Sequence, residues 1–271
     1  MKIEKLPIII IIFVLAANAF AHEYWFETDN FRPAPSEKSV VHLYVGDGLV
    51  RDREERPFQP DKTPDFRLFS KNSTTDLKTS LAEGSLPIYN FSADREGTYL
   101  LAMERNWSYI VIDAAKFENY LREDGLDYII PERAAAGEST KEGRERYSRF
   151  LKCLLQVGDR RDDTYKKRVG MKLEIVPLEN PYSKKVGDTL RLQIFFDGRP
   201  LAGHTVFADN RASTTQKMTT DKTGKFTIRL DQNGMWLVRL VFMRRCATGC
   251  GAADWESFWG AVTFGIEETT K

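Results

Sequence analysis

The stretch NGMWLVRLVFM, residues 233–243, carries the strongest local signal for the fold. Asn233-Gly234 is a typical hairpin turn, because both residues adopt the positive φ angles of a tight turn at little cost. The run Met235–Met243 is apolar and rich in residues that favour strands. The stretch therefore predicts a β-hairpin whose second strand contains Trp236.

Similar short runs precede this stretch in the second half of the chain. They are separated by turn pairs such as Asp197-Gly198 and Thr223-Gly224. The runs are Lys172–Pro177, Thr189–Phe196, His204–Ala208 and Lys225–Leu230. Because strands at this spacing are typical of sandwiches, residues 169–271 are predicted to form an immunoglobulin-like β-sandwich that folds alone.

The first half is also β-rich. Alternating or apolar runs bounded by polar residues predict four strands. These are Ser39–Val45, Phe66–Phe69, Thr98–Glu104 and Ser108–Ile112. Leu49–Pro64 has few apolar residues to bury, so we expect a long surface loop there.

A helical period replaces the strand period after Asp113. Phe117, Tyr120 and Leu121 share one helix face, which predicts a first helix. A second helix is predicted from the spacing of Tyr147, Phe150, Leu151, Leu154 and Leu155. Pro131–Gly143 is expected to connect the two.

The charged segment Gly158–Lys167 is the predicted domain boundary. The fold class is therefore mainly β with a helical insertion. A β-rich domain of residues 22–168 ends in two helices, and the sandwich of residues 169–271 follows it.

The amino terminus has the features of a cleavable signal peptide. Lys2 and Lys5 precede the apolar run Ile8–Ala17, and Ala19 and Ala21 stand at the positions that signal peptidase reads. Residues 1–21 are therefore predicted to be removed, with cleavage between Ala21 and His22. The mature protein is expected in the periplasm or outside the cell, without stable membrane insertion.

Composition excludes some partners and limits disulfide pairing. The 40 basic and 39 acidic residues are interspersed, so no electrostatic footprint for nucleic acid is present. The chain has three Cys, so at most one disulfide forms within it. Cys246 and Cys250 are the disulfide candidates, with metal ligation as the alternative, and Cys153 is expected to pack in the core.

Several longer segments resemble a known exported family. They are Ala21–Trp25, Glu145–Arg149, Leu173–Pro177, Asn180–Tyr182, Gly198–Gly203, Thr220-Asp221 with Gly224, Gly234–Trp236 and Asp254–Ser257. They are similar to an uncharacterised exported family related to the NikM-like periplasmic component of nickel/cobalt uptake systems. Members often carry a His after the glycine that ends the early strand, where this chain has Asp47 after Gly46. The resemblance implies metal handling with a membrane metal-uptake system as partner.

His22 is the sharpest candidate ligand. Cleavage after Ala21 would give it a free α-amine beside its imidazole, and the two nitrogens can chelate one metal ion. Nitrogen ligands of this kind suit Cu(II) or Ni(II), and the resemblance adds Co(II). The alternative is a frayed terminus without function.

A third ligand must come from elsewhere in the chain. His42, on a predicted strand, and His204, after a turn, are the other two histidines. Each is also explained as an ordinary hydrogen-bonded side chain. Asp47 and Glu23 could supply oxygen ligands.

Three functional hypotheses follow. The first is a soluble periplasmic metal-binding protein that acts in nickel, cobalt or copper uptake through its amino-terminal His. The second is an envelope interaction or structural module without metal. The third is a copper-dependent oxidase with an amino-terminal His. The sequence has no nucleophile elbow and no His-Glu-x-x-His motif, so we expect no hydrolytic enzyme.

Overall fold

A computed structural model of the chain describes residues 22–49 and 51–267. The predicted signal peptide and its cleavage site at Ala21 lie outside these residues. The described chain is mainly β with a small helical insertion, which confirms the predicted fold class at this level. Neither described α-helix is long and apolar enough to cross a membrane.

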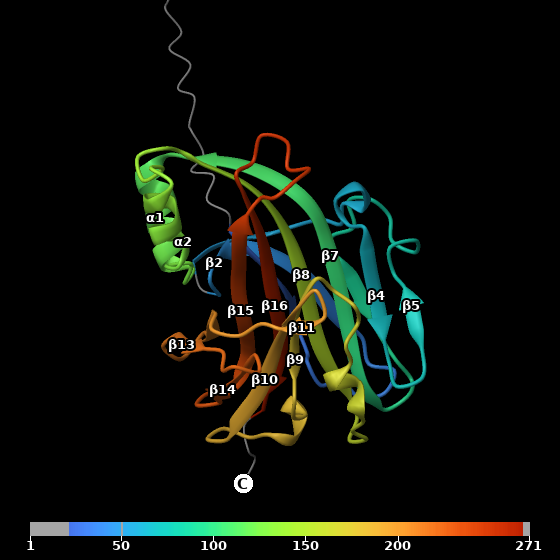
Figure 1. Cartoon of the computed structure of the whole chain (residues 1–271). Coiled ribbons are helices and arrows are strands. Elements are labelled where there is room, and N and C mark those ends of the chain that lie inside the picture. Colours follow the sequence, from blue (N-terminus) through green and yellow to red (C-terminus); the bar gives the residue numbers. More distant parts are fainter. Residues whose placement is uncertain (1–21, 50, 268–271) are drawn as a thin grey trace, which may run out of the picture.

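The described strands fall into three sheets that form three layers (Figure 1). The central sheet has the order β13-β12-β15-β16-β8-β7-β4-β5. Its strands are β13 (Gln216–Thr219), β12 (Thr205–Asn210), β15 (Gly234–Arg245), β16 (Trp255–Ile266), β8 (Gly143–Val157), β7 (Gly97–Ile112), β4 (Asp65–Phe69) and β5 (Thr74–Asp76).

A smaller sheet covers each face of the central sheet. The front sheet contains β9 (Leu173–Pro177), β10 (Thr189–Phe196), β11 (Arg199–Pro200) and β14 (Lys225–Arg229). The back sheet contains β1 (Glu23–Thr28), β2 (Ser39–Asp47), β3 (Arg51–Glu55) and β6 (Tyr89–Phe91). The 3-10 turns are η1 (Pro60–Lys62), η2 (Asp163–Lys166) and η3 (Pro181–Ser183).

Side chains of β8 point alternately to the two faces of the central sheet, so this strand contributes to both of the main hydrophobic cores. Leu151, Cys153 and Leu155 are buried in the cluster under the back sheet. Phe150 and Leu154 are buried in the cluster under the front sheet. Successive side chains of a strand point to opposite faces, so a strand covered on both sides carries apolar side chains in both directions.

The predicted second helix is therefore wrong, because residues 143–157 form β8. A strand buried on both faces loses its period-two pattern and becomes a continuous apolar run, which periodicity cannot distinguish from a buried helix. The first helix is confirmed as α1 (Ala114–Glu123), and Asp113 caps it by accepting a hydrogen bond from the backbone of Lys116.

The predicted hairpin at Asn233-Gly234 is also wrong. The strand before the turn, β14, pairs with β10 in the front sheet, whereas β15 pairs with β12 and β16 in the central sheet. The turn therefore carries the chain from one layer to another. Gly234 has the positive φ of 85° that the sequence indicated.

Three smaller predictions need correction. The expected loop Leu49–Pro64 contains β3, an edge strand that pairs with β2 and needs no apolar side chains for its backbone hydrogen bonds. The expected connector Pro131–Gly143 overlaps α2 (Ile129–Ala135). The two predicted strands of residues 98–112 are one strand, β7, with a register shift between Arg105 and Ser108.

The two helices cover the same face of the central sheet as the back sheet does. Phe117 and Leu121 of α1 pack with Val241, Met243 and Trp259 in a third cluster. Figure 1 shows both helices beside one end of β15. This face of the central sheet therefore has two separate covers.

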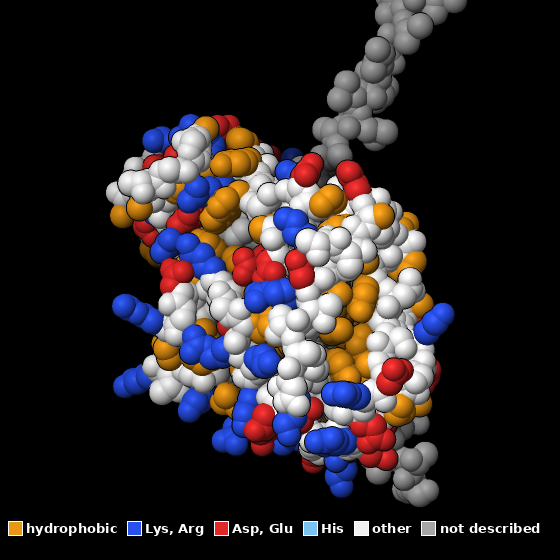
Figure 2. Space-filling view, turned by 90° about the vertical axis from the view of Figure 1, so that its right-hand side faces the viewer, with side chains coloured by type: hydrophobic (Ala, Val, Ile, Leu, Met, Phe, Trp, Pro, Cys, Tyr) orange, Lys and Arg blue, Asp and Glu red, His pale blue; other side chains and the backbone are white. Residues whose placement is uncertain are grey.

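The outer surface carries mixed charge. Figure 2 shows basic and acidic side chains interspersed over one face, with hydrophobic side chains between them. This distribution agrees with the formal net charge of +1.

The predicted boundary at residues 168 and 169 is crossed by the central sheet. β16 pairs in parallel with β8, from Trp255 opposite Glu145 to Thr263 opposite Cys153. The front core also combines Leu154 from the first segment with Leu192 from the second.

We expect a fragment from Val169 to Lys271 to lack a cooperative thermal transition, contrary to the sequence-based expectation that it folds alone. Its strand β16 would lose the hydrogen bonds to β8, and part of its core would face water. Circular dichroism melting and NMR chemical-shift dispersion of the fragment measure this. A cooperative transition with dispersed shifts would support two independent units instead.

Candidate functional site

A polar cleft of about 620 Å³ opens where the back sheet and helix α1 meet over the central sheet. Its walls come from β1, β2, α1, β12 and β15. Its lining includes five carboxylate side chains and two guanidinium groups. These are Glu23, Asp47, Glu123, Asp124, Asp209, Arg211 and Arg239. The lining is therefore acidic.

Arg239 joins the acidic side chains of this cleft. It lies in the middle of the apolar strand β15, and its guanidinium contacts the carboxylate of Glu23. Its Nε donates to Asp209 Oδ2 at 2.7 Å, and its Nη1 lies 3.7 Å from Asp124 Oδ1. One cation thus faces three largely buried carboxylates.

Two carboxyl groups of the cleft have raised pKa values. Burial raises the pKa of Glu23 to about 8, although Arg239 opposes the rise. Burial also raises the pKa of Asp124 to about 7, again against Arg239. Glu23 Oε2 is buried and has no hydrogen-bond partner among the described residues. The cleft therefore favours a bound cation or proton.

An aromatic pair forms the floor of the cleft. The rings of Tyr120 and Trp259 stack with centroids 6.0 Å apart and an interplanar angle of 1°. Behind them Tyr120 Oη donates to Glu145 Oε1 at 3.1 Å, and Trp259 Nε1 donates to Ser257 Oγ at 3.0 Å. Burial raises the pKa of Glu145 to about 7, while its hydrogen bonds with Ser257 and Tyr120 lower it.

His22 contacts the rim of the cleft through Asp47. β1 and β2 are antiparallel with Glu23 opposite Gly46, which brings His22 beside Asp47. His22 Nδ1 lies 2.6 Å from Asp47 Oδ1, and the His22 side chain is 34% exposed. The position where the resembled family often has a His therefore places a carboxylate against the predicted amino-terminal ligand.

The structure does not bring His42 to this site. His42 lies opposite Glu27 on the same strand pair, five residues along β2 from Asp47. At about 3.3 Å per residue this is a separation of roughly 16 Å. His42 Nδ1 lies 2.7 Å from Glu55 Oε1 and its Nε2 lies 3.4 Å from Asp29 Oδ1.

His204 has surroundings of a different kind. Its ring packs edge-on against Tyr128 and Phe242, with centroids 5.1 and 5.0 Å away. Burial lowers the pKa of His204. The three histidines therefore do not form one metal site.

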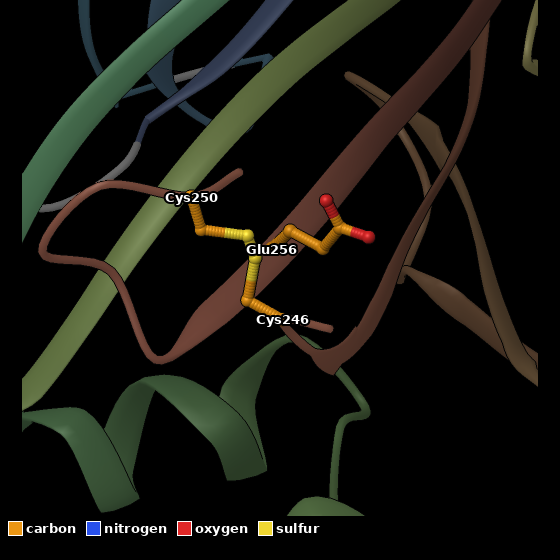
Figure 3. Close-up of side chains that lie close together, drawn as sticks. All are labelled: Cys246, Cys250 and Glu256. Carbon is orange, nitrogen blue, oxygen red and sulfur yellow. A yellow bond between two sulfur atoms is a disulfide. The ribbon is translucent and has the colours of Figure 1, made fainter. Parts of the chain in front are cut away.

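Cys246 and Cys250 lie in the loop between β15 and β16 and are joined as a disulfide (Figure 3). Their Cα atoms are 6.2 Å apart, within the usual disulfide range. The carboxylate of Glu256 lies close to the sulfur atoms, and the three could be considered as metal ligands. However, Glu256 accepts hydrogen bonds from Arg146 and Arg244, which neutralise it.

Cys153 lies apart from this loop, in β8. It is fully buried, and burial raises the pKa of its thiol to about 12. It therefore packs as an apolar side chain, although in a strand and not in the helix expected from the sequence.

Sequence reasoning named His22, Glu23 and Asp47 but missed the rest of the cleft. Arg239 gave the clearest signal, since it is a single charge within the apolar run 235–243. Asp124 and Asp209 gave none, because ordinary surface carboxylates look the same in the sequence. Only the long-range packing of α1 and β12 brings them to Arg239.

A family model described as "Domain of unknown function (DUF4198)" matches residues 19–244. The match covers more than half of the chain, so the chain belongs to this family. The search of curated proteins found no match. The family is a class of domain without a named activity.

We expect the Glu145→Gln variant to show a weaker pH dependence of unfolding than the native protein. The folded-state pKa of Glu145 is raised to about 7, so the folded state binds more protons than the unfolded state above about pH 4.5. Native stability should therefore fall between pH 4.5 and pH 7, by about 3 kcal/mol from this group.

Urea unfolding at several pH values measures the difference. Glu142→Gln, which changes an exposed glutamate three residues earlier, is the matched control and should keep the native slope. Parallel curves for the native protein and Glu145→Gln would show that the raised pKa is wrong.

Proposed function

We propose that this chain is an exported metal-binding protein that takes up one Ni(II), Co(II) or Cu(II) ion at His22. Cleavage behind Ala21 would create the α-amine that completes the site. Its role would be metal uptake or handling together with a membrane uptake system, as the resemblance to the NikM-like component suggests.

The observation that carries the proposal is the contact between His22 and Asp47. A carboxylate oxygen 2.6 Å from Nδ1 is within reach of any metal ion bound to that nitrogen. The α-amine and Nδ1 of an amino-terminal His close a six-membered ring with a metal. The amine, the imidazole and the carboxylate together make a mixed nitrogen and oxygen donor set that suits late divalent transition metals.

The charge of the cleft adds support. Asp47 also lines the acidic cleft, and Glu23, the residue after His22, has one buried oxygen without a partner within residues 22–49 and 53–267. An excess of carboxylates raises the local concentration of cations and speeds their association. The cleft therefore favours delivery of a divalent cation to the amino terminus.

Export is the first requirement of this proposal. We expect the protein, expressed in a bacterium with its natural amino terminus, to reach the periplasm with an intact mass that begins at His22. Amino-terminal sequencing and mass spectrometry of the fraction measure this. A mature form that retains residues 1–21 would eliminate the amino-terminal site, because His22 would have no free amine.

We expect the processed protein to bind one Cu(II) or Ni(II) ion, and binding to weaken at least tenfold when one residue is added before His22. The added residue converts the amine to an amide, which is a poor ligand at neutral pH, while the imidazole and Asp47 remain. Asp47→Asn should weaken binding as well. Acidification should weaken it further, because protons compete for the nitrogen ligands.

Calorimetry after chelator treatment compares these forms. His42→Ala is the matched control, since His42 lies on the same strand pair but well away from His22. Equal affinity of the extended and processed forms would overturn the amino-terminal site. Failure of every form to bind metal would favour an interaction module.

A further inference from the structure

A pair of buried arginines lies under the back sheet, near the end of the cleft where His22 lies. Arg105 of β7 is the cross-strand partner of Arg149 of β8. Arg105 is only 7% exposed and Arg149 only 6%. Both guanidinium carbons contact the ring of Tyr24, at 5.0 and 4.2 Å from its centroid. The two like charges are therefore held close together.

The partners of these arginines in the described chain are neutral. Arg105 Nη2 donates to Gln59 Oε1 at 2.7 Å, and Arg149 Nη2 donates to the backbone oxygen of His22 at 2.9 Å. Neither arginine forms a salt bridge with a carboxylate in residues 22–49 and 53–267. Glu145 attracts Arg149 electrostatically, but no hydrogen bond joins their side chains in that part of the chain.

Each of the two guanidinium groups also has a buried N–H donor without an acceptor among the described residues. Arg105 Nη1 and Arg149 Nε are buried and have no acceptor within the part of the chain that the structure describes. Arg56 Nε is a third buried donor without an acceptor there, although Arg56 Nη1 pairs with Glu54 Oε1 at 2.6 Å. The charge of Arg56 also acts on Arg105. Burial lowers the pKa of Arg105 and Arg149, yet a guanidinium does not lose its proton in a protein.

The aromatic rings offset only part of this cost. Tyr24 and Tyr147 attract the guanidinium groups through their faces, with Arg149 Cζ 4.6 Å from the Tyr147 centroid. A ring face does not accept the N–H groups that lie in the guanidinium plane. A buried charge without a counter-ion destabilises the fold, and like charges at opposed strand positions destabilise it further.

We propose that Arg105, Arg149 and Arg56 bind a small oxyanion, a carboxylate or a phosphate. The planar fork of donors on arginine fits two oxygens of such a group, and bonds between charged partners are the strong class of hydrogen bond. Arg56, whose side chain is 30% exposed, and the partly exposed Tyr147 mark the side from which the anion enters. The bound anion supplies the charge and the acceptors that the described residues do not give to Arg105 and Arg149.

Thermal unfolding of the mature protein, residues 22–271, tests the proposal. It is run metal-free with acetate, citrate, phosphate or sulfate against chloride at equal ionic strength. We expect one oxyanion to raise the Tm saturably, by roughly 5 to 10 °C at a hundredfold excess over its Kd. Comparing the carboxylates with phosphate and sulfate identifies the class of ligand.

Variants separate binding from a structural role. Arg105→Met and Arg149→Met should abolish the oxyanion effect and leave the Tm in chloride unchanged or higher, because each removes an uncompensated buried charge. Arg149→Lys should retain the fold and bind at least tenfold more weakly, since it keeps the charge but loses the fork. Arg122→Gln, which changes an exposed arginine on α1, is the matched control.

The result that overturns the proposal is equally specific. Either no oxyanion raises the Tm above chloride, or the Arg105→Met and Arg149→Met proteins respond as the native one does. His22→Ala keeps the backbone oxygen that Arg149 contacts, so it should retain the oxyanion effect. Failure of the metal site therefore leaves this test intact.

Discussion

The structure depends on covering both faces of one eight-stranded sheet. Its central strand β8 has apolar side chains on either side, and each face must be removed from water by a different layer. On one face of the central sheet, the front sheet is the only layer that excludes water from the described core. The parallel pairing of β8 with β16 ties the two halves of the chain into this single arrangement.

The other face of the central sheet is covered partly by the back sheet and partly by the two helices, and the cleft lies where these meet. The back sheet covers the part built on β4, β7 and β8, while α1 and α2 cover the part built on β15 and β16. A strand that passes from one cover to the other must cross this seam. Arg239 is the residue of β15 at the crossing, which explains a charge within an otherwise apolar strand.

The limits of prediction follow from the same layering. Strands such as β2 and β10 were predictable because turn residues and local alternation define them within a few residues. β8 was not, since burial on two faces removes its alternation. The turn at Asn233-Gly234 was identified, but turn chemistry does not say whether the next strand returns to the same sheet.

The candidate site shows the same division between local and long-range information. His22 was recognisable because the predicted cleavage after Ala21 would give it a free α-amine, and Asp47 was recognisable from the pattern of the resembled family. The contact between them is set by the register of β1 and β2. Asp124 reaches Arg239 only because α1 packs beside β15, a contact that no local pattern encodes.

The distribution of buried charge argues that the two sites are distinct features of the fold. Glu23 and Tyr24 are consecutive in β1, and successive side chains leave a strand on opposite sides. Glu23 reaches a cleft that has more carboxylates than arginines, while Tyr24 covers arginines that form no salt bridge within the described residues. Mutual pairing of these groups would have neutralised both, yet β1 holds them apart. A fold that keeps opposite charges separate does so at a cost in stability.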